Sequence, residues 1–169
     1  MSIRIVPIEA QHIESFHAAL DSAARERRFL AMFRAPPLEN MREFITRNIT
    51  SGHPQFVALD GTTVVGWCDV LPAWADALRH RGTLGMGLRA AYRGQGLGTQ
   101  LLAATIAKAQ TRGIHRIELE VRADNVVAIA LYRRFGFEQD GIFRKAMLVD
   151  ATYFDCVRMS LIAPHSRSR

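Results

Sequence analysis

Two hydrophobic periods alternate along the chain, and their alternation predicts a mixed α/β fold. Apolar residues that recur every three or four positions favour helices, whereas short runs rich in β-branched and aromatic residues favour strands. The helical period predicts four helices, over residues 11–24, 38–50, 97–111 and 126–134. The strand pattern predicts seven strands, over residues 3–6, 55–59, 63–71, 83–88, 114–121, 137–148 and 152–161. This order of elements is typical of a mixed α/β domain.

Turn-forming and helix-breaking residues mark the ends of these elements. Asp60-Gly61 separates two strand-like runs and is a favoured tight-turn pair, so it predicts a β-hairpin. Pro36-Pro37 must break any helix that precedes residue 38. Gly136 follows the fourth predicted helix at the position where a glycine commonly ends a helix.

The most informative stretch is residues 93–99, Arg-Gly-Gln-Gly-Leu-Gly-Thr, which joins a predicted strand to a predicted helix. Glycines lack a Cβ atom, so successive backbone N–H groups can turn toward one point. The start of the helix adds unpaired N–H groups and the positive end of its dipole. Arg93 can supply a full positive charge. We therefore predict a phosphate or pyrophosphate site here, against the simpler interpretation of a glycine turn that only feeds the helix.

Two familiar phosphate motifs fit this stretch poorly. A Walker loop requires Gly-Lys-Ser/Thr, whereas Gly98-Thr99 is followed by glutamine. A dinucleotide fingerprint that starts at Gly94 would need a third glycine where Thr99 stands. Glu118 and Glu120 do fall roughly where the ribose-binding acid of that motif belongs. The preceding strand, however, contains two glycines and differs from a buried parallel strand.

A coenzyme A site is the third interpretation, and two segments support it. Arg93-x-x-Gly96-x-Gly98 resembles the signature loop of the GNAT N-acetyltransferase superfamily. Residues 125–137, Asn-Val-Val-Ala-Ile-Ala-Leu-Tyr-Arg-Arg-Phe-Gly-Phe, resemble the Asn-x-x-Ala-x-x-Leu-Tyr-x-x-x-Gly-Phe helix of that family. The resemblance implies one GNAT-like domain over residues 1–163 and a basic tail over 164–169. It also implies a central, mostly antiparallel twisted sheet of about seven strands with helices on both faces.

The resemblance further implies which residues hold acetyl-CoA. The strand before the loop separates from its neighbour, and the pantetheine arm pairs with its main chain as an added strand would. Gly85 and Gly87 then permit close approach of a ligand, although neighbour packing is the simpler explanation. The expected cofactor-binding residues are Met86, Gly87, Leu88, Arg93, Gly94, Gln95, Gly96, Leu97, Gly98, Thr99, Asn125, Ala128 and Tyr132.

Tyr132 is the candidate general acid. Asn125, Ala128 and Tyr132 are three and four residues apart and share one helix face, with Asn125 where an N-cap is wanted. A phenol stays protonated at neutral pH and can donate its hydrogen to the departing thiolate of coenzyme A. The alternative is an aromatic residue at the edge of the core. An adjacent apolar stripe is expected to anchor this helix: Val127, Leu131 and Phe135.

The general base is assigned less directly. Glu118 and Glu120 alternate with arginines on one strand face and are the candidate catalytic carboxylates, the alternative being a solvated, charge-paired face. Many family members carry a glutamate on the strand before the glycine loop, but residues 83–88 contain none. Three further residues are weaker candidates for the base: Asp69, His80 and His115.

Composition and charge narrow the class of protein. The 169 residues are 49% hydrophobic and 22% charged, values that exclude a disordered or fibrous protein. A net charge of +6 favours anionic partners. No apolar run approaches the roughly 18 residues that a membrane span needs, and the two cysteines and scattered histidines lack metal-ligand spacing. We expect no metal, no membrane association and a cytoplasmic location. The basic cluster over residues 25–34 is typical of a solvated face, and the alternative is a surface that recognises a carboxylate.

These observations predict an acetyl-CoA-dependent N-acetyltransferase. The acetyl group is expected to pass directly to a primary amine of an amino acid, a small amine or a protein N-terminus, in a pocket that includes Phe29, Phe33, Arg34 and Tyr153. The alternatives are a non-catalytic acyl-CoA sensor and a basic nucleic-acid-binding module. The latter lacks helix-turn-helix spacing, zinc ligands and the aromatic strand signature of RNA readers, so no nucleic-acid partner is expected. Family habit points to a homodimer.

Overall fold

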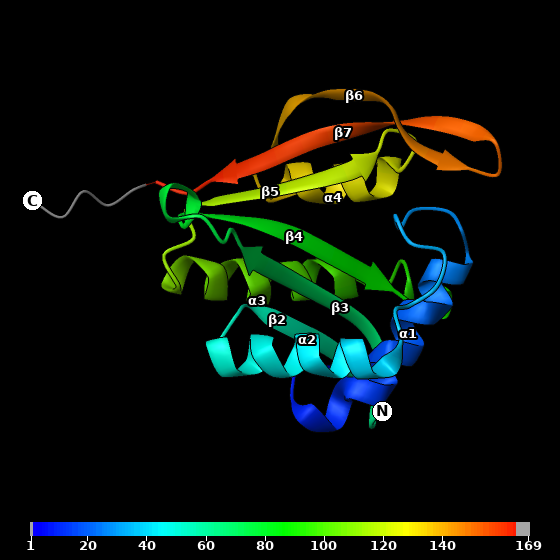
Figure 1. Ribbon diagram of the computed structural model, residues 1–169, viewed down its shortest axis with the longest axis vertical. Helices are drawn as coiled ribbons and strands as arrows, with labels where there is room; N and C mark the ends of the chain where they lie inside the picture. The colour runs from blue at the N-terminus through cyan, green and yellow to red at the C-terminus, as the bar shows by residue number, and fades with distance from the viewer. Residues whose placement is uncertain (1, 165–169) are drawn as a thin grey trace, which may run out of the picture.

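The strand-forming runs pair into one twisted sheet in the computed structural model, which describes residues 2–164 (Figure 1). The strands lie in the order β1-β2-β3-β4-β5-β7-β6. Their bounds are Arg4–Pro7 (β1), Gln55–Asp60 (β2), Thr63–Pro72 (β3), Arg81–Leu88 (β4), Arg116–Arg122 (β5), Glu138–Val149 (β6) and Thr152–Ile162 (β7). Neighbouring strands are antiparallel except β4 and β5, which are parallel. The prediction of seven mostly antiparallel strands is confirmed.

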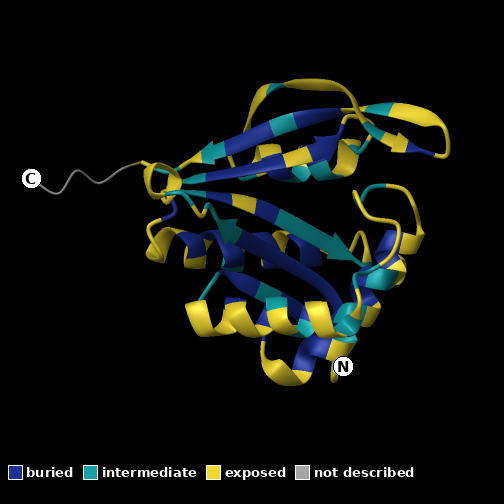
Figure 2. Cartoon of the chain, in the orientation of Figure 1, coloured by how far each residue is buried: buried dark blue, intermediate teal, exposed yellow. Residues whose placement is uncertain are grey.

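Two helices cover each face of the sheet. Helices α1 (Ile13–Arg25) and α2 (Leu38–Ser51) pack on one face, and α3 (Leu97–Thr111) and α4 (Val126–Arg134) pack on the other. Each helix turns its buried side toward the sheet and its exposed side toward solvent (Figure 2). Three single-turn 3-10 helices that no periodicity predicted lie in the connections: Ala10–His12, Asp76–Leu78 and Ala90–Tyr92. A three-residue turn is too short to show a helical period.

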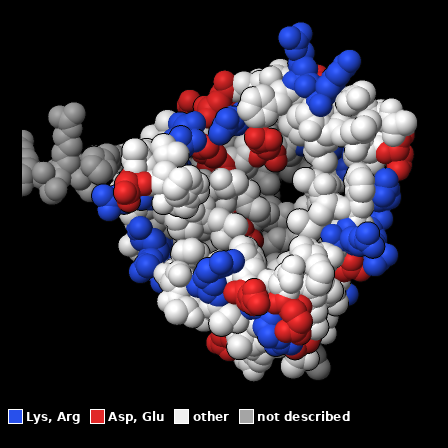
Figure 3. Space-filling model, in the orientation of Figure 1, with Lys and Arg blue, Asp and Glu red and all other residues white. Residues whose placement is uncertain are grey.

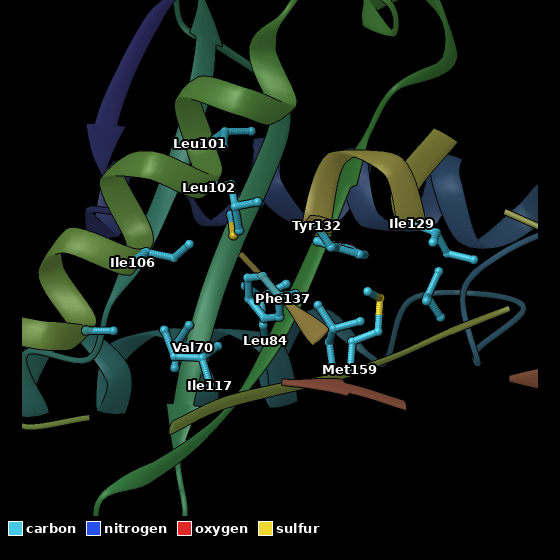
Figure 4. Packing of buried hydrophobic residues seen from close by; sticks show 14 of the residues in the cluster. Val70, Leu84, Leu101, Leu102, Ile106, Ile117, Ile129, Tyr132, Phe137 and Met159 are labelled. Atoms are coloured by element: carbon cyan, nitrogen blue, oxygen red, sulfur yellow. The ribbon is translucent and has the colours of Figure 1, made fainter. Parts of the chain in front are cut away.

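The larger hydrophobic cluster lies between the sheet and the helices α3 and α4. Leu101, Leu102 and Ile106 of α3 pack against the central strands, and Tyr132 of α4 lies near Phe137 (Figure 4). Leu101 and Leu102 are fully buried, so α3 is fixed along its length. This packing holds the start of α3, and therefore the glycine loop, at the end of β4.

The parallel pair β4–β5 is short and opens into a gap. It covers only residues 81–83 of β4 and 116–118 of β5. Beyond this point β4 stays paired with β3 as far as Leu88, whereas β5 stays paired with β7 as far as Arg122. The two strands move apart in Figure 1, and the space-filling view shows a deep hollow at the same place (Figure 3). We call this gap the β4–β5 opening.

Three expectations differ from the structure in detail. Asp60 pairs with Thr63 as the last residue of β2, so the hairpin turn consists of Gly61 and Thr62 rather than of Asp60-Gly61. Val127 is 79% exposed and does not anchor α4; the buried residues of that helix are Ile129 and Tyr132. The predicted basic tail beyond residue 164 lies outside the described residues. Within residues 2–164, no helix is long and apolar enough to cross a bilayer.

Candidate active site

The glycine loop presents a row of unpaired backbone amides. Gly94 has φ +73° and Gly96 has φ +77°, and a Cβ atom at either position would meet no heavy atom within 4 Å. Gly96 is the N-cap of α3, and no side chain caps that helix. None of the described residues accepts a hydrogen bond from the amides of residues 94–99. Six consecutive N–H groups at a helix start therefore remain available to an anion.

Gly98 serves packing rather than backbone conformation. A Cβ atom there would lie 3.3 Å from the Leu131 side chain and 3.6 Å from the Met86 side chain. The first turn of α3 therefore fits closely against both α4 and β4. This contact places the loop next to the β4–β5 opening.

Arg93 is tied to the protein rather than free. Its guanidinium donates two hydrogen bonds to Glu26, at 2.7 and 2.8 Å, and two to the Leu88 carbonyl. The charge that the sequence analysis assigned to a phosphate is thus shared with Glu26. A second cation is present, because Arg134 of α4 reaches to 3.5 Å from the Thr99 hydroxyl.

The two glycines of β4 are explained by their neighbours on β3. A Cβ atom on Gly87 would lie 2.4 Å from the Trp67 ring, and one on Gly85 would lie 3.3 Å from the Asp69 carboxylate. Neighbour packing, the simpler of the two interpretations, accounts for both. The outer edge of β4 over Met86, Gly87 and Leu88 still has no strand partner, because β5 pairs only as far as residue 83, although the Leu88 carbonyl already accepts the two hydrogen bonds from Arg93.

Helix α4 brings its three motif residues together on one side. The Asn125 side chain accepts a hydrogen bond from the Ala128 amide at 3.2 Å, so Asn125 caps the helix. Tyr132 is 6% exposed, and its ring lies 5.6 Å from that of Phe137. Burial raises the Tyr132 pKa above its usual range, and no described residue bonds its hydroxyl. The phenol is therefore protonated at neutral pH and has a hydrogen to donate.

Glu118 is held by three arginines. Its carboxylate accepts hydrogen bonds from Arg116 at 2.6 Å, Arg81 at 2.8 Å and Arg158 at 3.0 Å. Burial would raise the Glu118 pKa, but these three bonds together lower it to about 2. A carboxylate with such a pKa is too weak a base to take a proton from an ammonium group. Glu118 and its three arginines line a cavity of about 480 Å³ together with Asp140, Gly141, Ile142 and Phe143.

Glu120 and Arg122 follow Glu118 on the same face of β5. Glu120 is exposed and lies opposite Arg158 in the β5–β7 register. Arg122 is 6% exposed, and its guanidinium stacks on the Phe154 ring at 3.5 Å. It donates to the Asp124 carboxylate and to the Arg28 carbonyl. Arg122 therefore fastens the connection between α1 and α2 to the far side of the opening.

The basic cluster over residues 25–34 is largely occupied by contacts within the protein. Arg25 pairs with Asp21 at 2.5 Å, and Arg27 pairs with Asp150 of the β6–β7 hairpin at 2.6 Å. The Arg27 guanidinium also stacks on the Phe33 ring at 3.9 Å. The Arg27–Asp150 ion pair therefore connects this segment to the β6–β7 hairpin.

Asp69, a weaker candidate for the base in the sequence, lies buried on β3 beside β4. It is 8% exposed, and no described residue gives it a hydrogen bond or an ion pair. Burial raises its pKa to about 7. Residues 83–88 contain no glutamate, and Asp69 is a carboxylate that lies opposite this strand, at Gly85. His80 and His115 join β4 to β5 through the backbone, where the His115 amide donates to the His80 carbonyl.

No group of three or more His, Cys, Asp or Glu residues within residues 2–164 could hold a metal ion. The two cysteines, Cys68 and Cys156, are free and buried, and burial raises the pKa of both thiols. A thiol with a raised pKa is a poor nucleophile at neutral pH.

Known proteins are similar to this chain in sequence and in fold. The model of the Acetyltransferase (GNAT) family matches residues 17–137. An L-methionine sulfoximine/L-methionine sulfone acetyltransferase of Pseudomonas aeruginosa is 31% identical over 134 residues, which cover 78% of this chain and 77% of that protein. A [ribosomal protein bS18]-alanine N-acetyltransferase of Salmonella typhimurium is 39% identical over 70 residues, 41% of this chain and 47% of that protein.

Solved structures agree over nearly the whole chain. The crystal structure of a ribosomal-protein-alanine N-acetyltransferase from Brucella melitensis has a TM-score of 0.87 and 26% identity, covering 94% of this chain and 99% of that one. A GNAT superfamily phosphinothricin acetyltransferase from Sinorhizobium meliloti, solved in complex with acetyl-CoA, has a TM-score of 0.88 at 20% identity, covering 100% and 93%. The second likeness concerns the fold alone.

Proposed function

The chain belongs to the acetyltransferase (GNAT) family and is an acetyl-CoA-dependent N-acetyltransferase, and we propose that its glycine loop, the β4–β5 opening and Tyr132 carry the reaction. The observation that supports this most is the row of six free amides at residues 94–99 beside a strand whose outer edge is unpaired. A pyrophosphate and an extended amide-bearing arm require these two features side by side.

The loop binds the diphosphate of acetyl-CoA through its main chain. The free amides at Gly94, Gly96 and the first turn of α3 point their hydrogens at one anion, and Arg134 adds positive charge. The pantetheine arm lies along residues 86–88 and forms the main-chain hydrogen bonds that β5 would otherwise supply. The thioester then reaches the middle of the opening, near Tyr132.

Tyr132 assists departure of the thiolate. As the amine attacks the thioester carbon and the C–S bond breaks, negative charge develops on sulfur, and the buried phenol donates its hydrogen there. Ala128, one turn earlier on α4, leaves room for the cofactor beside it. Glu120, on the β5 edge of the opening, attracts the positively charged ammonium form of the acceptor.

The acceptor is the α-amino group of an amino acid or of a peptide N-terminus. One relative is named for acetylating an amino acid analogue and another for acetylating the alanine of a ribosomal protein, so both present an α-amino group. The segment over residues 26–37 and the β6–β7 hairpin, bridged by the Arg27–Asp150 ion pair, border the acceptor side. The homodimer and the cytoplasmic location remain predictions.

A thiol-release assay tests this proposal. Purified protein and acetyl-CoA are mixed with methionine sulfoximine, free amino acids, polyamines and a peptide with N-terminal alanine, and free coenzyme A is measured. We expect release with at least one α-amine, and Tyr132→Phe should lower kcat by about 10- to 100-fold with unchanged acetyl-CoA affinity. Acetyl-CoA binding without release from any amine would favour the acyl-CoA sensor instead.

A matched pair of glycine variants tests the loop. Gly96 and Gly113 both have φ +77° and open space around a Cβ atom, and they lie at opposite ends of α3. Valine at either position strains the backbone to a similar extent. We expect Gly96→Val to weaken acetyl-CoA binding at least tenfold, measured by calorimetry, and Gly113→Val to leave it unchanged. Equal binding by both variants would show that the diphosphate is held elsewhere.

A further inference from the structure

Helix α2 and the strands β2 and β3 carry a row of buried polar side chains behind the β4–β5 opening, and the reaction described so far does not use them. Gln55 of β2 pairs with Asp69 of β3, and Asp69 pairs with Gly85 of β4, so the three positions lie side by side across the sheet. Asn48 of α2 donates a hydrogen bond to Gln55 Oε1 at 3.0 Å. The row therefore runs from α2 to the edge of the opening.

Two members of this row are buried without a protein partner. The Asp69 carboxylate is 8% exposed and receives no hydrogen bond or ion pair from the described residues. Gln55 is 2% exposed, and its Nε2 atom has no acceptor among those residues. Side chains at directly opposed positions of an antiparallel pair have Cβ atoms about 5 Å apart, so the two groups are neighbours. An unsatisfied buried polar group is costly, so the retention of the unpartnered Gln55 Nε2 points to a use, whereas the Asp69 oxygens lack a protein partner in the described chain but keep some contact with solvent.

The missing side chain of Gly85 leaves space for the Asp69 carboxylate at the edge of the opening. A Cβ atom on Gly85 would lie only 3.3 Å from Asp69 Oδ1, so the carboxylate occupies the space directly over β4 that a side chain of residue 85 would fill. Residue 85 lies two positions beyond the last β4–β5 pair, at the start of the gap. Residues 83–88 contain no glutamate, and Asp69 brings a carboxylate to that strand from its neighbour.

From this geometry, we propose that Asp69 is the proton acceptor for the amine substrate, and this inference rests on the proposed function. The ammonium nitrogen loses two protons in all. Asp69 takes the first, directly or through one water molecule, which frees the lone pair that forms the N–C bond. The second leaves nitrogen as the C–S bond breaks, and it replaces the proton that Tyr132 gives to the coenzyme A sulfur. The proton on Asp69 then passes to solvent.

No charged group of residues 2–164 lies directly against Asp69, so burial is what determines its pKa. Its strand neighbours present the neutral amide of Gln55 and the bare backbone of Gly85. The helices packed on this face turn neutral side chains inward: Ile13, Phe16 and Leu20 of α1 and Met41, Ile45 and Asn48 of α2. His53 reaches Asn48 Oδ1 at 3.3 Å, one step behind. Across the opening, β5 carries Glu120 and the Glu118 carboxylate, whose charge three arginines neutralise.

Burial alone raises the Asp69 pKa to about 7, so near neutral pH this carboxylate is partly ionised and a stronger base than an ordinary aspartate. The acceptor-dependent kcat/KM should therefore rise with pH through about 7 as Asp69 loses its proton. Asp69→Asn should lose this inflection and lower kcat by about 100-fold or more. Its acetyl-CoA affinity, measured by calorimetry, should stay unchanged because the diphosphate loop is untouched.

A relocated carboxylate separates catalysis from structure. Asp69→Ala removes the group and leaves room over β4, where Gly85 does not have a positive φ and accepts a side chain. The double variant Asp69→Ala/Gly85→Glu should recover activity to within about tenfold of the original, whereas Asp69→Ala alone should not. The matched control is Asp76→Asn, which removes an exposed carboxylate from the connection between β3 and β4.

The outcomes are distinguishable. A folded Asp69→Asn variant that keeps its activity and its inflection near pH 7 would overturn the role of Asp69 and leave the acetyltransferase function standing. Failure of the double variant, with acetyl-CoA binding intact, would also count against Asp69 as the base. Release of no thiol by the unaltered protein with any amine would overturn the proposed site and the role of Asp69 together.

Discussion

Asp69 and Glu118 are both buried carboxylates near the β4–β5 opening, yet their surroundings are opposite. Asp69 is 8% exposed beside a neutral amide and a glycine, and its pKa rises to about 7. Glu118 is 7% exposed among three arginines, and its pKa falls to about 2. The exposed fractions of the two side chains are nearly equal, but protein atoms surround the Asp69 carboxylate far more densely than that of Glu118. Denser burial raises the pKa of Asp69 and three donors lower that of Glu118, so both differences separate the two carboxylates.

The two carboxylates therefore differ in role. Glu118 joins β4, β5 and β7 through Arg81, Arg116 and Arg158, at the end of the opening where the strands are still paired. Asp69 lies where the strands have separated, on the side of the opening where we propose that the amine binds. One carboxylate stabilises the base of the gap, and the other has the pKa of a general base. Residues in an active site commonly lower stability in this way in exchange for reactivity.

The largest expected difference is in the pH dependence of stability at Asp69. Its folded pKa of about 7 exceeds the unfolded value of 3.8, so the folded protein binds more protons than the unfolded chain between these values. Stability should fall as pH rises from 4 to 7, and Asp69→Asn should not show this fall. The gap between the two proteins should change by about 3 kcal/mol between pH 4.5 and pH 8.

Urea unfolding of both proteins at the two pH values measures this gap. The asparagine amide introduces a constant cost of its own, so the change in the gap with pH is the informative quantity. A gap that is the same at pH 4.5 and pH 8 would contradict the raised pKa.

The opposite sign is expected at Glu118. Its folded pKa of about 2 lies below the unfolded value of 4.5, so its stabilisation is present above pH 4.5 and is lost as pH falls toward 2. Glu118→Gln should lower the free energy of unfolding at pH 7 by about 2 kcal/mol, because three partly buried arginines lose their shared anion. Chemical denaturation at pH 7 measures the loss.

Asp140→Asn is the matched control for that measurement. Asp140 also pairs with Arg116, at 2.6 Å, but its side chain is 32% exposed. Removing its charge should cost less than about 1 kcal/mol. Equal losses from Glu118→Gln and Asp140→Asn would show that the arginine cluster does not depend on its buried anion.

Local features of this molecule were predictable, and features that join distant segments were not. The helices over residues 97–111 and 126–134 match the prediction at both ends, because glycines and the helical period act within a few residues. The arginines around Glu118 come from positions 81, 116 and 158, and nothing in the local pattern brings them together. The burial of Asp69 likewise depends on strands β2 and β4.

Arg93 of the glycine loop shows the same difference between local features and contacts that join distant segments. The glycine spacing predicted the loop and its backbone conformation, which the positive φ angles of Gly94 and Gly96 show. The partner of Arg93 is Glu26, 67 residues earlier, and the folded chain alone brings the two side chains to 2.7 Å. Motif spacing predicts where a group stands in the chain. Tertiary packing decides what else competes for it.

The smallest expected effect is at Glu120, whose surroundings differ from those of both buried carboxylates. Glu120 is exposed at the edge of the opening, opposite Arg158, and it has neither the isolation of Asp69 nor the three arginines of Glu118. Its charge attracts the ammonium substrate from solvent, and water screens most of that attraction.

Glu120→Gln should therefore raise KM for the amine by about twofold to fivefold and change kcat little, with a larger effect at low than at high salt. Steady-state kinetics at two ionic strengths measures both constants, and Asp69→Asn provides the contrast of a lowered kcat. A loss of kcat in Glu120→Gln that equals the loss in Asp69→Asn, with the inflection near pH 7 removed by both, would place the two carboxylates in one proton-transfer unit. Asp69 would then not act alone as the base, and Glu120 would do more than attract the substrate.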